Sequence, residues 1–167
     1  AGEDEGGDLR AAVLTVSDGV ARGERADESG SVLEELLRAG GHDVFRRVVP
    51  DDRSEIAQAI EALTDEFELV LTTGGTGVAP RDVTPEATAS VVERQIPGVS
   101  EAIRADAVAR TPHGMLSRGI AGVRGGALVV NLPGSPGGCR DGFGVVREAL
   151  PHAVRLVAGE QGGHRQT

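Results

Sequence analysis

The chain has 167 residues and a formal net charge of −9, so it suits a single domain and repels nucleic acid and anionic membranes. Its aromatic residues are three Phe, which leaves a core of Val, Leu, Ile and Ala and excludes the aromatic platforms on which single-stranded nucleic acids stack. All 17 Lys and Arg positions are Arg, which excludes a Walker A lysine and a Schiff-base lysine. Neither nucleic acid nor a membrane is therefore an expected partner.

The two ends and the single cysteine bear on where the protein works. Residues 1–9 and 160–167 have little apolar content, and we expect disordered tails on either side of a domain over 10–159. Cys139 has no intramolecular disulfide partner, and no apolar run approaches the roughly 18 residues of a membrane helix. We expect a reducing, cytoplasmic location.

Between the tails, short apolar runs alternate with segments of helical periodicity. In chain order we expect a strand over 12–16, a helix over 31–39 that ends at Gly40-Gly41, a strand over 43–49, a helix over 54–63, a strand over 68–73, a helix from Thr84 to about Gln95, a helix over 99–109, a strand over 127–131, a turn over 133–138 and a helix over 139–157. Strands that are apolar on both faces and separated by helices indicate a mostly parallel sheet with helices on both sides, which is a three-layer α/β/α domain. In such sheets ligands bind at the carboxyl ends of the strands.

The glycine cluster that follows the strand over 68–73 is the most informative segment. Gly74, Gly75 and Gly77 stand beside the hydroxyls of Thr73 and Thr76. Backbone N–H groups in such a turn can form an anion-binding nest, and an ordinary tight turn in which only glycine fits explains the pattern equally well.

Two common phosphate-binding loops do not fit this cluster. The P-loop needs a lysine, which the chain lacks, and the dinucleotide fingerprint fails because Pro80 stands where its third glycine belongs. A second candidate anion site lies at residues 133–138, where Ser135 suits a helix N-cap and Pro136 the first helical position. An ordinary turn from strand to helix explains that segment too.

Acidic residues follow the expected strands at the same edge of the sheet. Asp82 comes soon after the glycines, just before Thr84, which suits the N-cap of the next helix. A carboxylate beside a phosphate nest is repelled unless a cation lies between them, and Mg²⁺ is typically held by one or two carboxylates plus substrate phosphates. Asp51 is the expected second ligand, because Asp52 has capping-box spacing to Glu55.

Other polar residues carry weaker signals. Asp18 is a third acidic candidate, although Asp18-Gly19 also suits a turn. Arg81, Arg118 and Arg124 could clamp phosphates, but solvated arginines are the default in so arginine-rich a chain. The four histidines lack metal-ligand spacing, and Cys139 is expected to pack as a small apolar residue.

Several stretches together resemble one known family. They are TVSD at 15–18, DESG at 27–30, VPDD at 49–52, LTTGGTG with RDVTPEAT at 71–88, MLSR at 115–118, AGVRG at 121–125 and NLPGSP at 131–136. This set is similar to the molybdopterin adenylyltransferases of the MogA/MoaB type and spans roughly residues 11–157. TTGGTG followed by RDVTPE is the specific part, whereas PGSP alone is not.

The resemblance implies an α/β/α domain, usually a homotrimer, that uses Mg²⁺ to transfer AMP from ATP to the terminal phosphate of molybdopterin and releases pyrophosphate. The family's acidic pair maps onto Asp51 and Asp82 as catalytic residues and metal ligands. The substrate-binding residues expected from the resemblance and from the strand ends are Ser17, Asp18, Thr73, Gly74, Gly75, Thr76, Gly77, Ser117, Pro133, Gly134 and Ser135. The chain departs from the family at Ser135, where many relatives have Asn.

Two other functions stay open at this point. The first is a non-catalytic paralogue that binds molybdopterin or a partner without adenylylating it, against which the intact acidic pair argues. The second is molybdate insertion, whose enzymes usually carry further domains; such an enzyme is also a possible partner. The absence of lysine and of an activated serine or cysteine agrees with adenylyl transfer, in which the substrate's own phosphate is the nucleophile.

Overall fold

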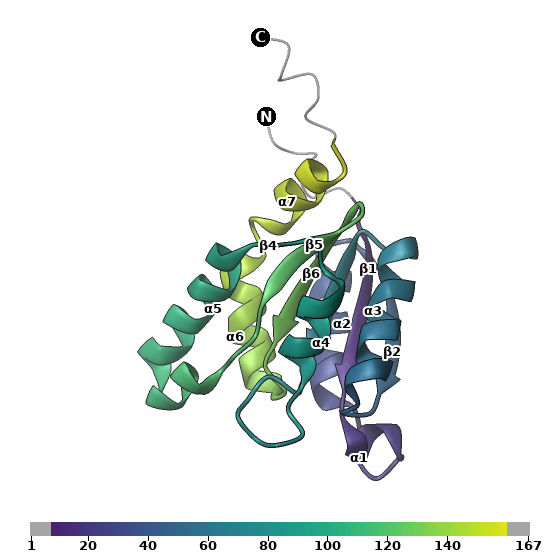
Figure 1. Cartoon of the computed structure of the whole chain (residues 1–167). Coiled ribbons are helices and arrows are strands. Elements are labelled where there is room, and N and C mark those ends of the chain that lie inside the picture. Colours follow the sequence, from purple (N-terminus) through teal and green to yellow (C-terminus); the bar gives the residue numbers. More distant parts are fainter. Residues whose placement is uncertain (1–7, 160–167) are drawn as a thin grey trace.

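A computed structural model describes residues 8–159 of the chain. Six strands form one sheet in the spatial order β2-β1-β3-β6-β5-β4 (Figure 1). Four of them are mutually parallel: β1 (Arg10–Val16), β2 (Asp43–Val49), β3 (Leu69–Thr73) and β6 (Ala127–Leu132). The short strands β5 (Ala121–Arg124) and β4 (Arg94–Gln95) add antiparallel pairs at one edge. The prediction of a mostly parallel α/β sheet is confirmed.

Helices cover both faces of the sheet, and Figure 1 shows α3 and α4 in front of it with α2 and α6 behind. Successive side chains of a strand point to opposite faces, so Ala11 and Val13 of β1 enter one core while Ala12 and Leu14 enter the other. The first core is closed by α2 (Glu28–Ala39), α5 (Pro97–Arg110), α6 (Pro136–Val146) and α7 (Leu150–Val157). The second is closed by α3 (Arg53–Glu66) and α4 (Thr84–Val91).

Several predicted boundaries are wrong, each for a physical reason. The helix expected to reach Gln95 ends at Val91, because the chain turns there to pair with β5 through Glu93 N and the Val123 carbonyl. The single helix expected over 139–157 is two, α6 and α7, because Pro151 cannot continue a helix that passes through it. Strand β2 is an edge strand with largely exposed side chains, so it is not apolar on both faces.

Two short helices were not predicted. Helix α1 (Asp18–Ala21) lies in the polar segment after β1, and the 3-10 helix η2 (Pro112–Leu116) follows α5. Both are only about one turn long, which is too short for apolar periodicity to reveal them.

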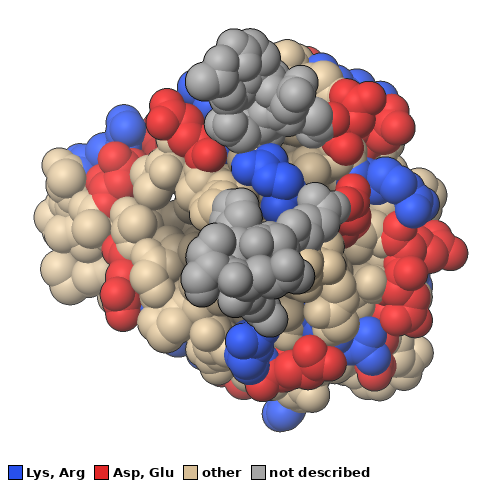
Figure 2. Space-filling model, turned by 90° about the horizontal axis from the view of Figure 1, so that it is seen from above, with Lys and Arg blue, Asp and Glu red and all other residues tan. Residues whose placement is uncertain are grey.

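The amino-terminal ends of the parallel strands lie at the top of the molecule in Figure 1, and Figure 2 shows that end with Arg side chains interspersed among Asp and Glu. Of the expected tails over 1–9 and 160–167, the structure describes only Asp8 and Leu9, and Leu9 is buried in the core. From residue 8 to residue 159, no helix has both the length and the apolar character that crossing a membrane requires.

Candidate functional site

A cavity of about 350 Å³ opens at the carboxyl ends of the parallel strands. It lies at the point where the chain changes direction across the sheet. From β1 the chain passes to β2 on one side, and from β2 it crosses to β3 on the other side of β1. Segments that follow β1, β2, β3 and β6 all contribute to its lining. The lining residues are Thr15, Val16, Ser17, Val20, Arg25, Ala26, Asp27, Glu28, Ser29, Asp51, Thr73, Gly74, Gly75, Asp82, Gly134 and Pro136.

The glycine turn after β3 forms one wall of the cavity. Gly74 has φ 102° and Gly75 has φ 70°, and in these backbone conformations a residue with a side chain would be strained. A Cβ on Gly74 would collide with the Val16 carbonyl oxygen, and one on Gly75 with Thr84 Oγ1. The tight-turn interpretation is therefore correct for both glycines.

The same turn keeps backbone donors available. Within residues 8–159, the amides of Gly75, Thr76 and Gly77 donate no hydrogen bond, while that of Gly74 donates to the Leu132 carbonyl. Thr84 is not the N-cap that the sequence suggested: Val83 occupies that position without a side-chain cap bond, and the Thr84 hydroxyl instead donates to the Gly74 carbonyl at 2.9 Å. Helix α4 thus holds the turn in place, and the free amides support the anion-nest hypothesis.

Asp51 lines the cavity from the loop after β2. The Asp18 amide donates to Asp51 Oδ2 at 2.9 Å, and the Asp51 amide donates to Asp18 Oδ1 at 3.0 Å. Among the described residues, nothing donates a hydrogen bond to Asp51 Oδ1. Burial, reinforced by the negative charges of Asp18 and Asp82, raises the pKa of Asp51 despite the hydrogen bond from Asp18. Its neighbour Asp52 caps α3 through the Glu55 amide at 2.9 Å, as predicted.

Asp82 faces the same cavity from the turn before α4. Its Oδ2 accepts the Ala79 amide at 3.0 Å, which fixes the side chain, and no donor in the described part of the chain reaches Oδ1. Each of the two aspartates therefore has one oxygen held by backbone and one left without a partner.

This donor set fits a hard divalent cation such as Mg²⁺, which takes oxygen ligands and often needs only one or two carboxylates beside substrate phosphates. The raised pKa of Asp51 agrees with this, because burial and, to a smaller extent, the charges of Asp18 and Asp82 disfavour its anionic form, and a bound cation would stabilise that form. The described residues contain no cluster of three or more His, Cys, Asp or Glu placed to hold a metal on their own. A cation here would therefore depend on the substrate for further ligands.

Arg118 holds the turn that carries Asp82. Its backbone amide donates to the Thr76 carbonyl at 2.8 Å, Nε to the Gly77 carbonyl at 2.7 Å, and Nη2 to the Asp82 carbonyl at 2.7 Å. Its Nη1 donates to Glu86 Oε2 at 2.5 Å, and this bond holds the pKa of Glu86 below its ordinary value. One side chain thus joins both ends of the 77–82 segment to the start of α4.

The structure brings together most of the expected site but not all of it. Seven of the predicted residues line the cavity: Ser17, Asp51, Thr73, Gly74, Gly75, Asp82 and Gly134. Asp18 lies beside it and pairs with Arg81, whose Nε donates to Asp18 Oδ2 at 2.6 Å and lowers the pKa of that carboxyl.

The remaining predicted residues lie outside the lining of the cavity. Ser135 caps α6 by accepting the Gly138 amide at 3.0 Å, and the Pro133 carbonyl accepts the Thr73 hydroxyl at 2.6 Å. The backbone carbonyls of Thr76 and Gly77 are taken by Arg118. Ser117 borders a separate small void with Arg104 and Asn131. Their predicted substrate contacts stay predictions.

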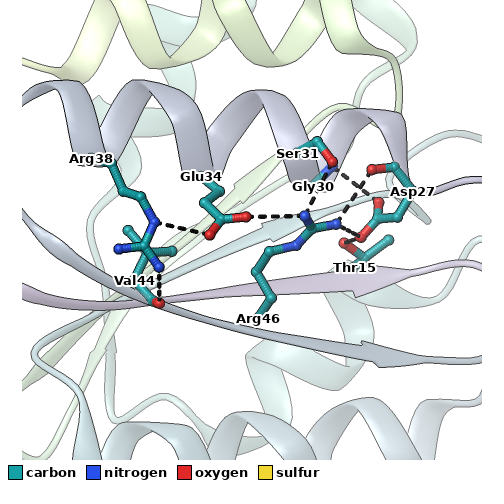
Figure 3. Close-up of polar contacts among 8 residues, drawn as sticks. All are labelled: Thr15, Asp27, Gly30, Ser31, Glu34, Arg38, Val44 and Arg46. Atoms are coloured by element: carbon teal, nitrogen blue, oxygen red, sulfur yellow. Dashed lines mark hydrogen bonds and ion pairs between the residues drawn. The ribbon is translucent and has the colours of Figure 1, made fainter.

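Sequence reasoning missed the wall formed by the N-cap and first turn of α2. Asp27, Glu28 and Ser29 line the cavity there, and DESG at 27–30 was the available signal. Figure 3 shows why the Asp27 carboxylate is held: Thr15 Oγ1 donates to it at 2.7 Å, the Gly30 amide at 3.0 Å and Arg46 Nη2 at 2.7 Å.

Cys139 lies beneath the site and takes no part in its surface. It is fully buried, and its sulfur lies 3.2 Å from Thr73 Oγ1 and from the Pro133 carbonyl oxygen. Burial raises the pKa of its thiol to about 11, so it is a neutral packing residue, as predicted.

Comparison with known proteins places this geometry in context. Residues 12–152 match the sequence model of a family described as "Probable molybdopterin binding domain". The chain is 39% identical over 159 residues to "Molybdenum cofactor synthesis protein cinnamon" of Drosophila melanogaster, in an alignment that covers 93% of this chain and 26% of that protein. It is 38% identical over 152 residues to "Molybdopterin adenylyltransferase" of Helicobacter pylori (strain 26695), covering 88% of this chain and 86% of that protein.

The chain therefore spans about a quarter of the length of the Drosophila relative and most of the Helicobacter one. The crystal structure of the molybdopterin biosynthesis enzyme MoaB of Thermus thermophilus superposes on it with a TM-score of 0.85 at 45% identity. That superposition covers 90% of this chain and 97% of the other.

Proposed function

Because this chain belongs to the molybdopterin-binding domain family that its residues 12–152 match, we propose that it is a molybdopterin adenylyltransferase, which transfers AMP from ATP to the terminal phosphate of molybdopterin. Its place in molybdenum cofactor biosynthesis and its kinship with proteins named for this activity follow from the sequence matches. The reaction in this chain, its need for Mg²⁺ and the roles of individual residues are the proposal.

One observation carries the proposal: two carboxylates with free oxygens face the same cavity as a turn with free backbone amides. Asp51 and Asp82 both line the cavity beside Gly74 and Gly75. Such a site binds phosphate and a cation together, which a reaction between two phosphate-bearing substrates requires.

In the proposed reaction a terminal phosphate oxygen of molybdopterin attacks the α-phosphorus of ATP. The new bond joins that oxygen to the α-phosphorus, the bond between the α-phosphorus and the bridging oxygen to the β-phosphorus breaks, and pyrophosphate leaves with the electron pair. No protein nucleophile is needed, in agreement with a chain that lacks lysine and whose cysteine is buried. The residues of the site act by binding and orientation.

Each part of the site then has a defined task. The amides of Gly75, Thr76 and Gly77 would receive a phosphate, and the free oxygens of Asp51 and Asp82 would hold Mg²⁺. The metal would supply charge neutralisation and alignment of the phosphates. Arg118 and Thr84 orient the turn that carries these groups.

Release of pyrophosphate from ATP, Mg²⁺ and molybdopterin tests the proposal, with a reaction lacking molybdopterin as the blank. We expect pyrophosphate only in the complete mixture, together with an adenylylated pterin of matching amount. Tight molybdopterin binding without any ATP-dependent product would replace this function by that of a non-catalytic binding protein. A product that forms only with molybdate would instead indicate metal insertion.

Assembly and location are part of the proposal as well. We expect a homotrimer that passes its product to a molybdate-insertion enzyme, as the family resemblance implies. A single buried cysteine supports a reducing compartment such as the cytoplasm.

A further inference from the structure

The cavity has a charge imbalance that the proposed substrates make worse. Its charged lining residues are Arg25 and four acids: Asp27, Glu28, Asp51 and Asp82. Phosphate-bearing substrates are themselves anionic. A single cation bound at Asp51 and Asp82 would therefore leave most of the negative charge of the substrates without a positive partner. A cationic side chain at the cavity is therefore of particular interest.

The arginines that the sequence suggested as phosphate clamps are already occupied. Arg81 is paired with Asp18 at 2.6 Å, Arg118 with Glu86 at 2.5 Å, and Arg124 with Asp65 at 3.4 Å. None of the three lines the cavity. Their guanidinium groups serve to hold loops and elements together.

Arg25 differs from them in both respects. It lines the cavity, and among residues 8–159 no carboxylate lies within ion-pair distance of it. Its Nη2 donates to the hydroxyl of Ser17 at 3.0 Å, and the same hydroxyl caps α1 by accepting the Val20 amide at 3.2 Å. The guanidinium is therefore anchored by a neutral group, with no ion-pair partner among the described residues and four of its five N–H donors free.

A glycine helps to place this side chain. A Cβ added to Gly19 would lie 3.2 Å from Arg25 Nε, which is tighter than about nine in ten real Cβ contacts, and 3.4 Å from Cδ, which is an ordinary contact. The absence of a side chain at Gly19 lets Arg25 lie over the backbone of α1 and reach Ser17. The hydrogen bond to Ser17 thus holds Arg25 at the cavity before any substrate arrives, and the missing side chain at Gly19 leaves room for that position.

We propose that Arg25 is a substrate-binding residue that receives a phosphoryl group in this cavity. This inference rests on the proposed function, because that function supplies the phosphate-bearing substrates. A guanidinium binds phosphate oxygens through parallel N–H bonds that lysine cannot reproduce. The phosphate is either part of the ATP triphosphate or the terminal phosphate of molybdopterin, and the experiment below separates the two.

The test compares the Arg25→Ala and Arg25→Lys variants with Arg22→Ala. Arg22 is a matched control: it lies three residues earlier in the same exposed segment, is paired with Glu24 at 3.0 Å and does not line the cavity. Calorimetric titration with pyrophosphate and with ATP, each in the presence of Mg²⁺, measures affinity without turnover, and a third titration uses molybdopterin. We expect Arg25→Ala to weaken at least one of these ligands about 10- to 100-fold, which is the usual worth of a charged hydrogen bond.

The other variants sharpen the result. Arg25→Lys should keep part of the affinity, and Arg22→Ala should stay within about 2-fold of the wild type. Weaker pyrophosphate and ATP binding assigns Arg25 to the nucleotide, whereas weaker molybdopterin binding alone assigns it to the pterin phosphate. Unchanged affinity of Arg25→Ala for all three ligands overturns the inference.

Turnover separates this inference from the proposed function. A wild-type protein that binds phosphate ligands through Arg25 but releases no pyrophosphate from ATP would disprove the proposed reaction and leave Arg25 as an anion-binding residue. A wild-type protein that turns over, with Arg25→Ala indistinguishable from it in affinity and in KM for both substrates, would disprove the role of Arg25 alone. A wild-type protein that binds none of the three ligands disproves both.

Discussion

Two carboxylates that line the cavity, Asp27 and Asp51, have contrasting surroundings. Asp27 accepts hydrogen bonds from a hydroxyl, a backbone amide and Arg46, which also bonds to Glu34, as Figure 3 shows. Asp51 accepts one backbone bond, and its pKa is raised by burial and by nearby acids. The fold satisfies the first carboxylate completely and leaves the second partly unsatisfied.

The same contrast extends to their neighbours. Glu34 lies between Arg38 and Arg46, whose hydrogen bonds hold its pKa below the ordinary value. A carboxylate whose oxygens are all hydrogen-bonded stabilises local structure. A carboxylate with an unpaired oxygen at a cavity is electrostatically unfavourable, and a bound ligand can remove that penalty. The difference distinguishes the structural acids of this protein from its candidate catalytic ones.

The largest expected effect is the loss of turnover when one carboxylate oxygen of Asp51 or Asp82 is replaced by an amide nitrogen. We expect Asp82→Asn and Asp51→Asn each to lower kcat/KM by about 100-fold or more, since metal-assisted charge stabilisation is worth several kcal/mol. Initial rates of pyrophosphate release measure it. Asp52→Asn is the matched control, because Asn replaces Asp well at an N-cap and that side chain only caps α3. Full activity in Asp82→Asn would remove Asp82 from the metal site.

Substitutions near Asp27 should change the free energy of unfolding rather than the reaction rate. Arg46→Met leaves the Asp27 side chain, only 9% exposed, with a charge and no cationic partner, and should lower the free energy of unfolding by roughly 2–3 kcal/mol. Urea denaturation checks this. Arg47→Met, at the next and exposed position of β2, should change stability by no more than about 0.5 kcal/mol. Equal midpoints for the two variants would mean that the Arg46 network contributes nothing.

A smaller effect is expected for Arg118, which positions the turn that carries Asp82. Lysine cannot bond to Gly77, Asp82 and Glu86 together, so Arg118→Lys should let the Asp82 turn move and lower the apparent Mg²⁺ affinity by about 10-fold. The Mg²⁺ dependence of turnover at saturating ATP measures this. Arg124→Lys serves as control, since its ion pairs lie away from the cavity. An unchanged Mg²⁺ curve for Arg118→Lys would show that the turn keeps its geometry without the clamp.

The smallest effect concerns the pH dependence of stability. The pKa of Asp51 is raised above its ordinary value of 3.8, so the folded protein holds that proton more tightly than the unfolded chain does. Its contribution to stability is therefore largest at low pH and falls as pH rises through the raised pKa. Asp51→Asn should remove this fall and give a slightly higher Tm than the wild type at neutral pH without Mg²⁺. A lower Tm for Asp51→Asn there, with Asp52→Asn unchanged, would contradict the assignment.

Much of the fold follows from local pattern. Successive apolar residues of β1 enter the two cores in turn, and Asp52 and Ser135 cap α3 and α6 as their sequence positions predicted. Pro151 was a signal for the break between α6 and α7 that helical periodicity concealed. Strands β4 and β5 could not be predicted, because two and four residues carry too little pattern and their pairing depends on β6.

The sequence by itself determined the α/β alternation, the glycine turn and the acids that follow the strands, because these depend on periodicity, steric demand and residue chemistry within a few positions. Only the tertiary structure decided which charges remain uncompensated. Arg118 and Arg25 look alike in the sequence, yet one is bound to Glu86 and backbone carbonyls while the other faces the cavity with a serine as its anchor. Ion pairing is set by side chains that meet from distant segments, and no local pattern specifies those meetings.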